Sequence, residues 1–265
     1  MTGALGQKVL VILGGTAGLG LSAAQRLVKE GARVVVVGRH AGDQSGIDLP
    51  SDACRVLLAE ATAPETAPKA VALAVEHFGA FHGLYHVAGG SGRRMGDGPL
   101  HELTDEGWRY TCELNATSVF YSNRAAVRQF LSQGTGGSVL NLSSVLSYSP
   151  APRFFSTHAY TAAKASIIGL TTACAAYYAP QGIRFNVLTP GLVATPMSQR
   201  AQSDPAIMDY IKTKQPLDGG RIGSPEDLDA AAVFFLSDAS KFVTGQVLAV
   251  DGGWSVSEGQ AKDQK

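Results

Sequence analysis

The chain has 265 residues, enough for one large α/β domain, and its 22 Lys and Arg residues balance its 22 Asp and Glu residues. This balance argues against nucleic acid or an anionic membrane as a partner and favours a small, weakly charged substrate. Because the three cysteines lie far apart without CxxC or metal-ligand spacing, we expect reduced core thiols at Cys54, Cys112 and Cys174. The N-terminus has no secretory signal pattern and no apolar run reaches membrane-spanning length, which predicts a cytoplasmic protein.

Runs of β-branched residues alternate with longer segments of helical apolar spacing, a pattern typical of a parallel sheet covered by helices on both faces. Seven strands are predicted, at residues 8–13, 33–38, 54–60, 83–89, 138–144, 184–190 and 246–252. Helices are predicted at about 19–30, 65–78, 106–132, 160–178, 198–212 and 225–237. No long linker interrupts them, so we expect a single α/β domain over residues 1–265, with a doubly wound sheet and a frayed polar tail from about residue 256.

A glycine-rich loop, "LGGTAGLG" at residues 13–20, joins the first strand to the first helix. Its three spaced glycines, Gly14, Gly18 and Gly20, allow the backbone to approach a pyrophosphate, and the following helix offers free N–H groups and the positive end of its dipole. The alternative is an ordinary tight turn. Its place between a strand and an amphipathic helix favours a dinucleotide-binding Rossmann fold.

The end of the second strand bears on the choice of cofactor. Dinucleotide-binding folds often carry an acidic residue here that selects NAD, but this chain has Gly38 followed by Arg39. A guanidinium can bind the 2′-phosphate of NADP through charge-assisted hydrogen bonds, so we expect NADP(H) to be favoured over NAD(H). The alternative is that Arg39 is a solvated loop residue.

Tyr160 and Lys164, in "HAYTAAK", lie four residues apart and therefore on the same face of a predicted helix. A nearby ammonium group, with an oxidised nicotinamide, favours the phenolate and lowers the tyrosine pKa toward neutral pH. Two further polar residues precede this helix. Ser144 ends the strand "GGSVLNLSS", and Asn115 lies within the long predicted helix 106–132, where a core-facing amide needs partners.

In order and spacing, these motifs resemble the short-chain dehydrogenase/reductase family. The resemblance extends over about residues 6–254 and includes "AGG" after the fourth strand, "GIRFNVLTPGLVATPM" at 182–197 and "VTGQVLAVDGG" at 243–253. It implies that Tyr160 is the acid/base and Ser144 orients the substrate oxygen. Lys164 would hold the nicotinamide ribose and lower the Tyr160 pKa, and Asn115 would serve a proton relay.

The resemblance also implies a set of cofactor contacts, spread over the glycine loop and four later strand ends. They are Gly14, Thr16, Gly18, Leu19, Gly20, Arg39, Glu60, Ala61, Ala88, Gly89, Tyr160, Lys164, Pro190, Gly191, Val193 and Thr195.

The sequence departs from the family pattern at a few positions. Leu13 replaces the usual Thr, and the family's "NNAG" is "HVAG" at residues 86–89, where a buried structural role for His86 is favoured over a catalytic one. Glu60 stands where the family contacts adenine with an acid. No cluster of His, Cys, Asp or Glu has metal-site spacing, so no catalytic metal is expected.

The substrate is not named by these residues. Residues 145–159 are about three longer than in the family and carry Phe154 and Phe155, which we interpret as an apolar wall or as a subunit contact, and Arg153, which can meet an anion. Residues 195–220 have the character of a lid. We expect a homo-oligomer, tetramer or dimer, through helices 106–132 and 160–178 and the last strand, as the resemblance implies.

Three functions are compatible with the sequence. The favoured one is an oxidoreductase transferring a hydride between NADP(H) and a small ketone or secondary alcohol. A 3-oxoacyl-thioester reductase acting on an acyl carrier protein is the alternative within the class. The third, from another class, is a dinucleotide-sensing binding protein without turnover.

Overall fold

The computed structural model describes residues 3–39 and 49–260, and its centre is one sheet of seven parallel strands in the order β3-β2-β1-β4-β5-β6-β7. This confirms the predicted doubly wound sheet. The strands are β1 (Val9–Leu13), β2 (Arg33–Gly38), β3 (Cys54–Leu58), β4 (Gly83–His86), β5 (Gly137–Leu142), β6 (Ile183–Pro190) and β7 (Val247–Val250).

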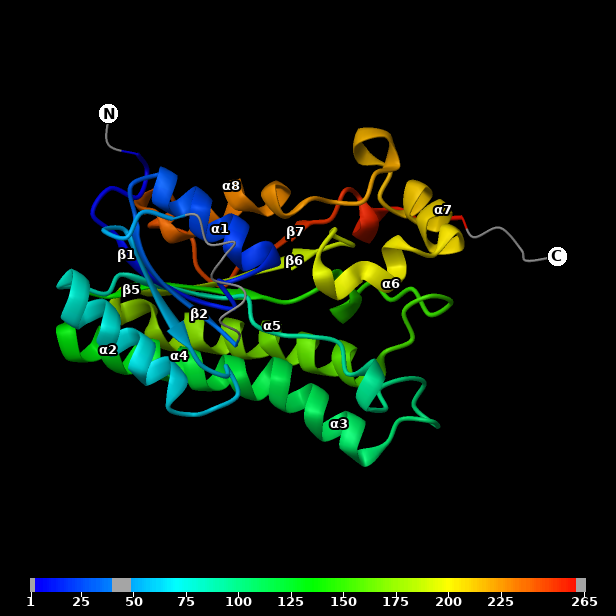
Figure 1. Ribbon diagram of the computed structural model, residues 1–265, viewed down its shortest axis with the longest axis horizontal. Coiled ribbons are helices and arrows are strands. Elements are labelled where there is room, and N and C mark those ends of the chain that lie inside the picture. Colours follow the sequence, from blue (N-terminus) through cyan, green and yellow to red (C-terminus); the bar gives the residue numbers. More distant parts are fainter. Residues whose placement is uncertain (1–2, 40–48, 261–265) are drawn as a thin grey trace.

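Helices cover both faces of the sheet. Helices α1 and α8 lie on one face, and α2, α4 and α5 lie on the other (Figure 1). The helices are α1 (Gly18–Lys29), α2 (Thr66–Phe78), α3 (Asp105–Cys112), α4 (Ser118–Gln133), α5 (His158–Tyr178), α6 (Gln199–Gln202), α7 (Pro205–Lys214) and α8 (Asp229–Leu236).

The alternation of side chains along β1 explains why both faces are covered. Leu10 and Ile12 join the core beneath α1 and α8, whereas Val9 and Val11 join the core beneath α2 and α4. All four side chains are fully buried. A strand that is apolar on both faces must be covered on both, because each exposed face would leave apolar area in water.

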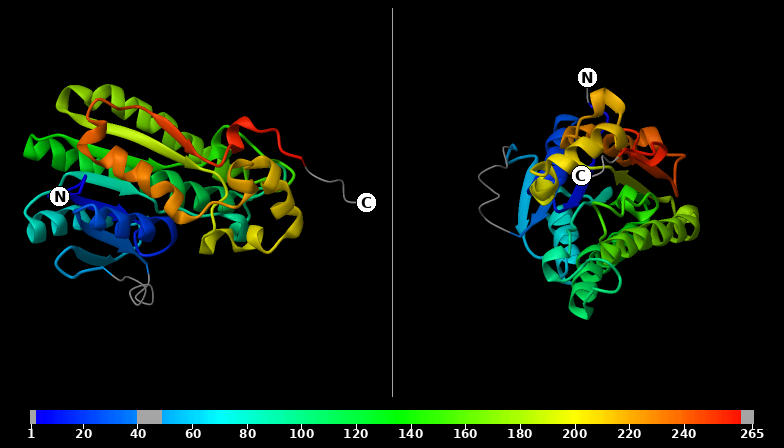
Figure 2. Two further views of the ribbon diagram at one scale, coloured as in Figure 1. Left: turned by 90° about the horizontal axis from the view of Figure 1, so that it is seen from above. Right: turned by 90° about the vertical axis from the view of Figure 1, so that its right-hand side faces the viewer.

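The strand order reverses between β1 and β4, and this point positions the site. In an open α/β sheet, ligands bind outside the carboxyl ends of the strands where the order reverses. The loops that follow β1 and β4 meet there, since a Cβ on Gly14 would lie 2.7 Å from the backbone nitrogen of Ala88. Figure 2 shows helices α6 and α7 gathered at one end of the sheet, beyond β6.

Two predicted helices are interrupted. The helix predicted at 106–132 is α3 and α4 joined by a π-helical turn, Glu113–Thr117. The helix predicted at 198–212 is divided into α6 and α7 because Asp204 caps α7, whose first residue is Pro205. Strands 54–60, 83–89, 138–144 and 246–252 end earlier than predicted, at Leu58, His86, Leu142 and Val250.

The C-terminal tail and the cysteines also differ in part from the predictions of a frayed tail and three core thiols. Residues 257–260 are not frayed, because they lie along α7, where the Gln260 N–H donates to Thr213 Oγ1 over 2.7 Å. The rest of the predicted tail, 261–265, lies outside the described residues. All three cysteines are free, but only Cys54 is buried, while Cys112 and Cys174 are partly exposed.

Candidate active site

Tyr160 and Lys164 lie in the first two turns of α5, on the side that faces the carboxyl end of β5. The Lys164 side chain is 3% exposed, and its Nζ donates to the carbonyl oxygen of Leu142, the last residue of β5, over 2.9 Å. The same Nζ lies 5.7 Å from the centroid of the Tyr160 ring. The helix and the strand end thus hold the ammonium group beside the tyrosine.

Burial dominates the acid–base properties of this pair. It raises the pKa of Tyr160 to about 12, while a hydrogen bond with Ser144 acts in the opposite direction. It also lowers the pKa of Lys164 to about 8, because an ammonium loses hydration in the interior. The predicted lowering of the tyrosine pKa, by Lys164 acting together with an oxidised nicotinamide, stays a prediction. Tyr160 is a protonated phenol at neutral pH, and so a potential proton donor.

Ser144 follows β5 directly. Its Oγ accepts a hydrogen bond from the Leu146 N–H over 3.2 Å, which caps a short 3₁₀ turn, Val145–Ser147. Its neighbour Ser143 donates through Oγ to the carbonyl of Lys164 over 2.7 Å. These contacts join the end of β5 to α5 and bring Ser144 to Tyr160.

Asn115 lies in the π-helical turn and is fully buried. Its Nδ2 donates to the carbonyls of Gly90 and Thr111, each over 2.9 Å, and its Oδ1 accepts from the Gly90 N–H over 3.1 Å. A Cβ on Gly89 would lie 2.7 Å from that oxygen and 3.1 Å from Lys164 Nζ. The loop after β4 therefore brings Asn115 and Lys164 together, and only a glycine fits between them.

Asp97 is a site residue that the sequence did not reveal. Its two carboxylate oxygens accept hydrogen bonds from the backbone N–H groups of Ala159 and Tyr160, each over 3.0 Å, and it is 5% exposed. The residue before α5, Thr157, makes no side-chain cap. A carboxylate from a loop more than sixty residues away thus caps the helix that carries Tyr160, in line with the helix dipole. No local sequence signal indicates this contact.

His86 is a buried, hydrogen-bonded core histidine, as favoured from the sequence. Its ring nitrogens lie 2.7 Å from Ser122 Oγ and 3.1 Å from the Ala88 carbonyl. Burial and the charge of Lys164 lower its pKa to about 3, so the imidazole is neutral at physiological pH.

The glycine loop has the geometry that a dinucleotide requires. Gly14 and Gly18 have φ values of +83° and +51°, in the left-handed region. A Cβ on Gly20 would lie 2.0 Å from the Gly14 carbonyl oxygen, so α1 starts against the loop only with glycine there. The residue before α1, Ala17, has no side chain that can cap the helix, which leaves its first N–H groups available to phosphate. These residues thus fit the pyrophosphate of a dinucleotide.

Packing explains why residue 38 is a glycine. A Cβ at this position would lie 1.9 Å from Thr16 Oγ1, so the loop that carries Thr16 leaves no room for a side chain. Arg39 follows directly and is exposed. The exposed Glu60 follows the neighbouring strand β3, and the Ala59 N–H donates to the Gly38 carbonyl over 2.8 Å.

The remaining predicted contacts lie after β3 and β6. Ala61 is partly exposed in the turn after β3, and Leu19 packs against the core in α1. Pro190 ends β6 and Gly191 follows it, and Val193 pairs with Gly223. The Thr195 methyl lies 3.6 Å from the Cβ position of Gly18, which brings this loop beside the glycine loop. The predicted cofactor contacts thus all lie along the carboxyl edge of the sheet.

Phe154 and Phe155 pack against other aromatic residues of this chain. The Phe154 ring centroid lies 5.1 Å from that of Tyr210 in α7, and the Phe155 centroid lies 5.7 Å from that of Trp254. Trp254 in turn donates from Nε1 to the Ser149 carbonyl over 3.0 Å. The segment between Ser144 and Tyr160 is therefore packed against α7 and the C-terminal segment.

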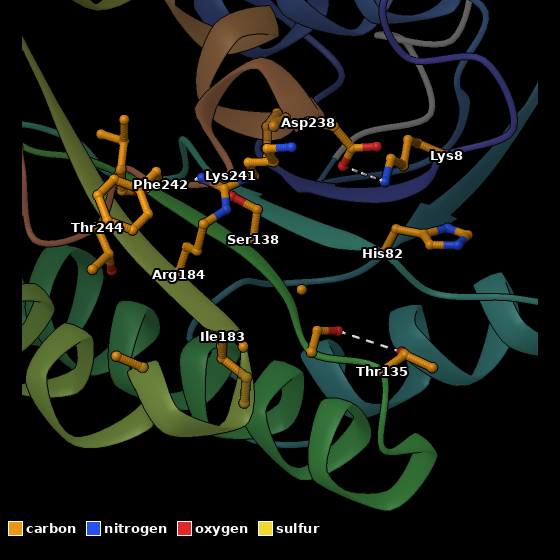
Figure 3. Close-up of a pocket in the computed structure, with 16 residues that line it drawn as sticks. Lys8, His82, Thr135, Ser138, Ile183, Arg184, Asp238, Lys241, Phe242 and Thr244 are labelled. Carbon is orange, nitrogen blue, oxygen red and sulfur yellow. Dashed lines mark hydrogen bonds and ion pairs between the residues drawn. The ribbon is translucent and has the colours of Figure 1, made fainter.

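A separate cavity of about 590 Å³ lies at the opposite, amino-terminal edge of the sheet (Figure 3). Three of its charged side chains already have partners within the protein. Lys8 pairs with Asp238 over 2.8 Å, and Arg184 donates to Ser240 Oγ over 2.8 Å and to the Phe235 carbonyl over 2.9 Å. Within the described residues, no group of three or more His, Cys, Asp or Glu side chains is arranged to hold a metal ion.

Comparison with known proteins identifies the family. A family model described as Enoyl-(Acyl carrier protein) reductase matches residues 14–255. L-rhamnose-1-dehydrogenase of Scheffersomyces stipitis is 34% identical, over 97% of this chain and 99% of its own. The structure of a short-chain type dehydrogenase/reductase from Mycobacterium ulcerans superposes with a TM-score of 0.87 at 31% identity, covering 96% of this chain and 92% of that one. The chain belongs to the short-chain dehydrogenase/reductase family.

A further member of the family, the NADP-dependent (R)-specific alcohol dehydrogenase of Lentilactobacillus kefiri, is 31% identical over 96% of this chain and 99% of its own. As a short-chain dehydrogenase/reductase, this chain is an oxidoreductase that acts on CH–OH groups with a nicotinamide cofactor. Among the helices in the described part of the chain, none has the length and apolarity needed to cross a bilayer.

Proposed function

We propose that this protein transfers a hydride between NADP(H) and a small ketone or secondary alcohol, with Tyr160 as the acid/base. The observation that carries the proposal is the pairing of a partly exposed, protonated Tyr160 with Ser144 beside the buried Lys164 ammonium. When bound, the nicotinamide supplies or accepts the hydride. The chain's own residues supply the proton and the geometry.

Each residue has a distinct role in this proposal. Ser144 orients the substrate oxygen toward Tyr160, which donates the phenolic proton on reduction and removes the hydroxyl proton on oxidation. Lys164 is a cation in a low-dielectric site and stabilises negative charge on the phenolate. Asn115 holds the Gly90 backbone next to Lys164, where protons pass to and from solvent.

The preference for NADP(H) rests on the end of β2. Gly38 offers no carboxylate to repel a 2′-phosphate, and the exposed Arg39 offers a guanidinium to bind it. The similar alcohol dehydrogenase of L. kefiri is NADP-dependent by name. Fluorescence titration of the protein with NADPH and NADH tests this preference. We expect the lower Kd for NADPH, and a lower Kd for NADH would contradict it.

Tyr160→Phe is the direct test of the mechanism. We expect turnover to fall at least about a thousandfold, because the proton donor is lost, while the Kd for NADPH changes little. Tyr177→Phe is a matched control on the exposed end of the same helix and should retain full activity. Retained turnover in Tyr160→Phe would overturn the acid/base assignment.

We also propose a homo-oligomer, a tetramer or dimer, as the working assembly. The proposal is supported by apolar side chains on the edge of the sheet, with Val247 and Leu248 of β7 each 40% exposed.

A further inference from the structure

Two arginines from different parts of the chain meet beside the segment that joins Ser144 to Tyr160. Arg93 belongs to the 3₁₀ turn Arg93–Met95 after β4, and Arg200 belongs to α6. Both donate from Nη2 to the carbonyl oxygen of Phe154, over 3.3 Å and 3.2 Å. Two positive groups thus share one neutral acceptor.

This arrangement leaves positive charge unneutralised. Within the described part of the chain, neither guanidinium forms an ion pair. Arg221, by contrast, makes three short bonds to Asp218 and Asp227. Each guanidinium carries five N–H donors, so most of the donors of Arg93 and Arg200 are unused by the protein.

The charged groups around Arg93 support the same conclusion. Burial and the nearby Arg200 both lower the pKa of Arg93, and only Asp97 acts in the opposite direction. The two oxygens of Asp97 already accept from the backbone of α5. Among the described residues that act on the charge of Arg93, one carboxylate, already hydrogen-bonded to α5, thus stands against two guanidinium groups.

The two arginines lie close to the reacting residues along the chain. Arg93 is three residues from Gly90, which binds Asn115, and four from Asp97, which binds the Tyr160 N–H. Phe154, which both arginines contact, is ten residues after Ser144 and six before Tyr160. Asp97, which binds the Tyr160 N–H, also acts on the charge of Arg93, so the two cations lie near the start of the helix that carries Tyr160.

We infer that the substrate is a hydroxy acid or oxo acid whose carboxylate binds Arg93 and Arg200. This inference rests on the proposed function and adds the class of substrate to it. On oxidation, the carbinol hydrogen leaves with its electron pair to the oxidised nicotinamide, the hydroxyl proton passes to Tyr160, and a carbonyl forms. The carboxylate is unchanged and serves only to bind. The inferred substrate is thus an anion, whereas the balanced net charge of the chain led us to expect a weakly charged one.

The test compares matched substrates that differ only in charge. A panel of aliphatic secondary hydroxy acids and their primary amides is assayed with NADP by absorbance of the nicotinamide, using the whole chain and the variants Arg93→Gln and Arg200→Gln. Glutamine retains a donor for the Phe154 carbonyl and removes the charge. Arg94→Gln, at the exposed neighbouring position, is the matched control.

We expect the parent enzyme to prefer the acids over the amides by at least about tenfold in kcat/KM. Each variant should lose about ten- to a hundredfold on the acids, mainly through KM, because a charge-assisted hydrogen bond is lost. Activity on the amides and the activity of Arg94→Gln should stay within about twofold. Equal losses on acids and amides, or a parent enzyme that prefers the amides, would overturn the inference.

Salt dependence and an assay with neutral alcohols test the inference further. If the variants fold poorly, the KM of the parent enzyme for acids should still rise with salt concentration while the KM for amides does not, and equal salt dependence would contradict the inference. If the enzyme turns over neutral alcohols and its kcat/KM for acids is no higher, the carboxylate site is refuted but the proposed function is not. Absence of turnover with every alcohol and carbonyl, including ketones and 3-oxoacyl thioesters, refutes the proposed function itself.

Discussion

At the scale of single residues, the replacement of the family's asparagine by His86 introduces a titratable group into the core. The imidazole is fully buried against Ser122 and Ala88, and its pKa of about 3 lies below the ordinary value of 6.5. Between these two values the unfolded chain binds a proton that the folded chain does not. Stability is therefore lost as pH falls from about 6.5 toward 3.

This predicts a difference in acid sensitivity between the parent protein and His86→Asn. From pH 7 to pH 5 the parent should lose about 2 kcal/mol more of its free energy of unfolding than the variant, because asparagine does not titrate. Urea denaturation at several pH values measures both slopes. His101→Asn, at an exposed histidine, should keep the parent slope. Parallel curves for His86→Asn and the parent would show that His86 does not carry the effect.

Site residues that are recognised by their spacing within one helix or turn were predictable from the sequence. Site residues whose contacts are with distant parts of the chain were not. Tyr160, Lys164 and the three loop glycines follow from spacing along one helix or one turn. Asp97 and Arg200 were missed as site residues because their partners lie 46 to 63 residues away along the chain. The absence of a side chain at Gly38 has a similar cause, since the space it leaves is filled by Thr16.

At the scale of elements, the start of α5 depends on a carboxylate supplied by another loop. Asp97 satisfies the N–H groups of Ala159 and Tyr160, and no side chain of the residue before the helix does so. The position of the Tyr160 hydroxyl is therefore coupled to the loop after β4. Because Arg93 lies on the same loop, one segment both orients the tyrosine and carries one of the two arginines of the proposed carboxylate site.

Asp97→Ala should lower both stability and activity. We expect the free energy of unfolding to fall by about 2 kcal/mol, because two buried N–H groups lose their acceptors, and Asp97→Asn should recover part of this loss. The kcat should fall about tenfold or more as the first turn of α5 loosens. Thr104→Ala removes a comparable cap from α3, where Thr104 Oγ1 accepts from the Gly107 N–H over 3.0 Å. This control should cost about 1 kcal/mol without a change in kcat. An unchanged kcat in Asp97→Ala would separate the cap from catalysis.

The elements themselves were predictable to different degrees. All seven strands were found, because buried parallel strands are continuous apolar runs that need no knowledge of their neighbours. The π-helical turn at Glu113–Thr117 was not, since the sequence "ELNAT" is compatible with an ordinary helix. The extra residue in that turn accompanies the contacts of Asn115 with the Gly90 backbone, which are tertiary contacts.

At the scale of the whole molecule, the sheet has one edge that is left apolar. Strand β7 is an edge strand with Val247 and Leu248 each 40% exposed, and Phe242, just before it, is fully exposed. An exposed apolar edge of this kind is typical of an interface, because a monomer would present both apolar area and unpaired backbone groups to water.

We therefore predict that Leu248→Asp weakens the assembly. Sedimentation velocity should give the parent a mass of two or four times the 27.6 kDa of one chain, and the variant half of the parent's mass. The reason is that a carboxylate on the edge strand must be desolvated when a second copy covers it. Leu100→Asp, at a side chain that is 72% exposed away from this edge, should keep the parent mass. Because the site described above is built from one chain, Leu248→Asp should retain turnover as the smaller species. A parent that sediments as a single chain, or a variant of unchanged mass, would contradict the assignment of this edge as an interface.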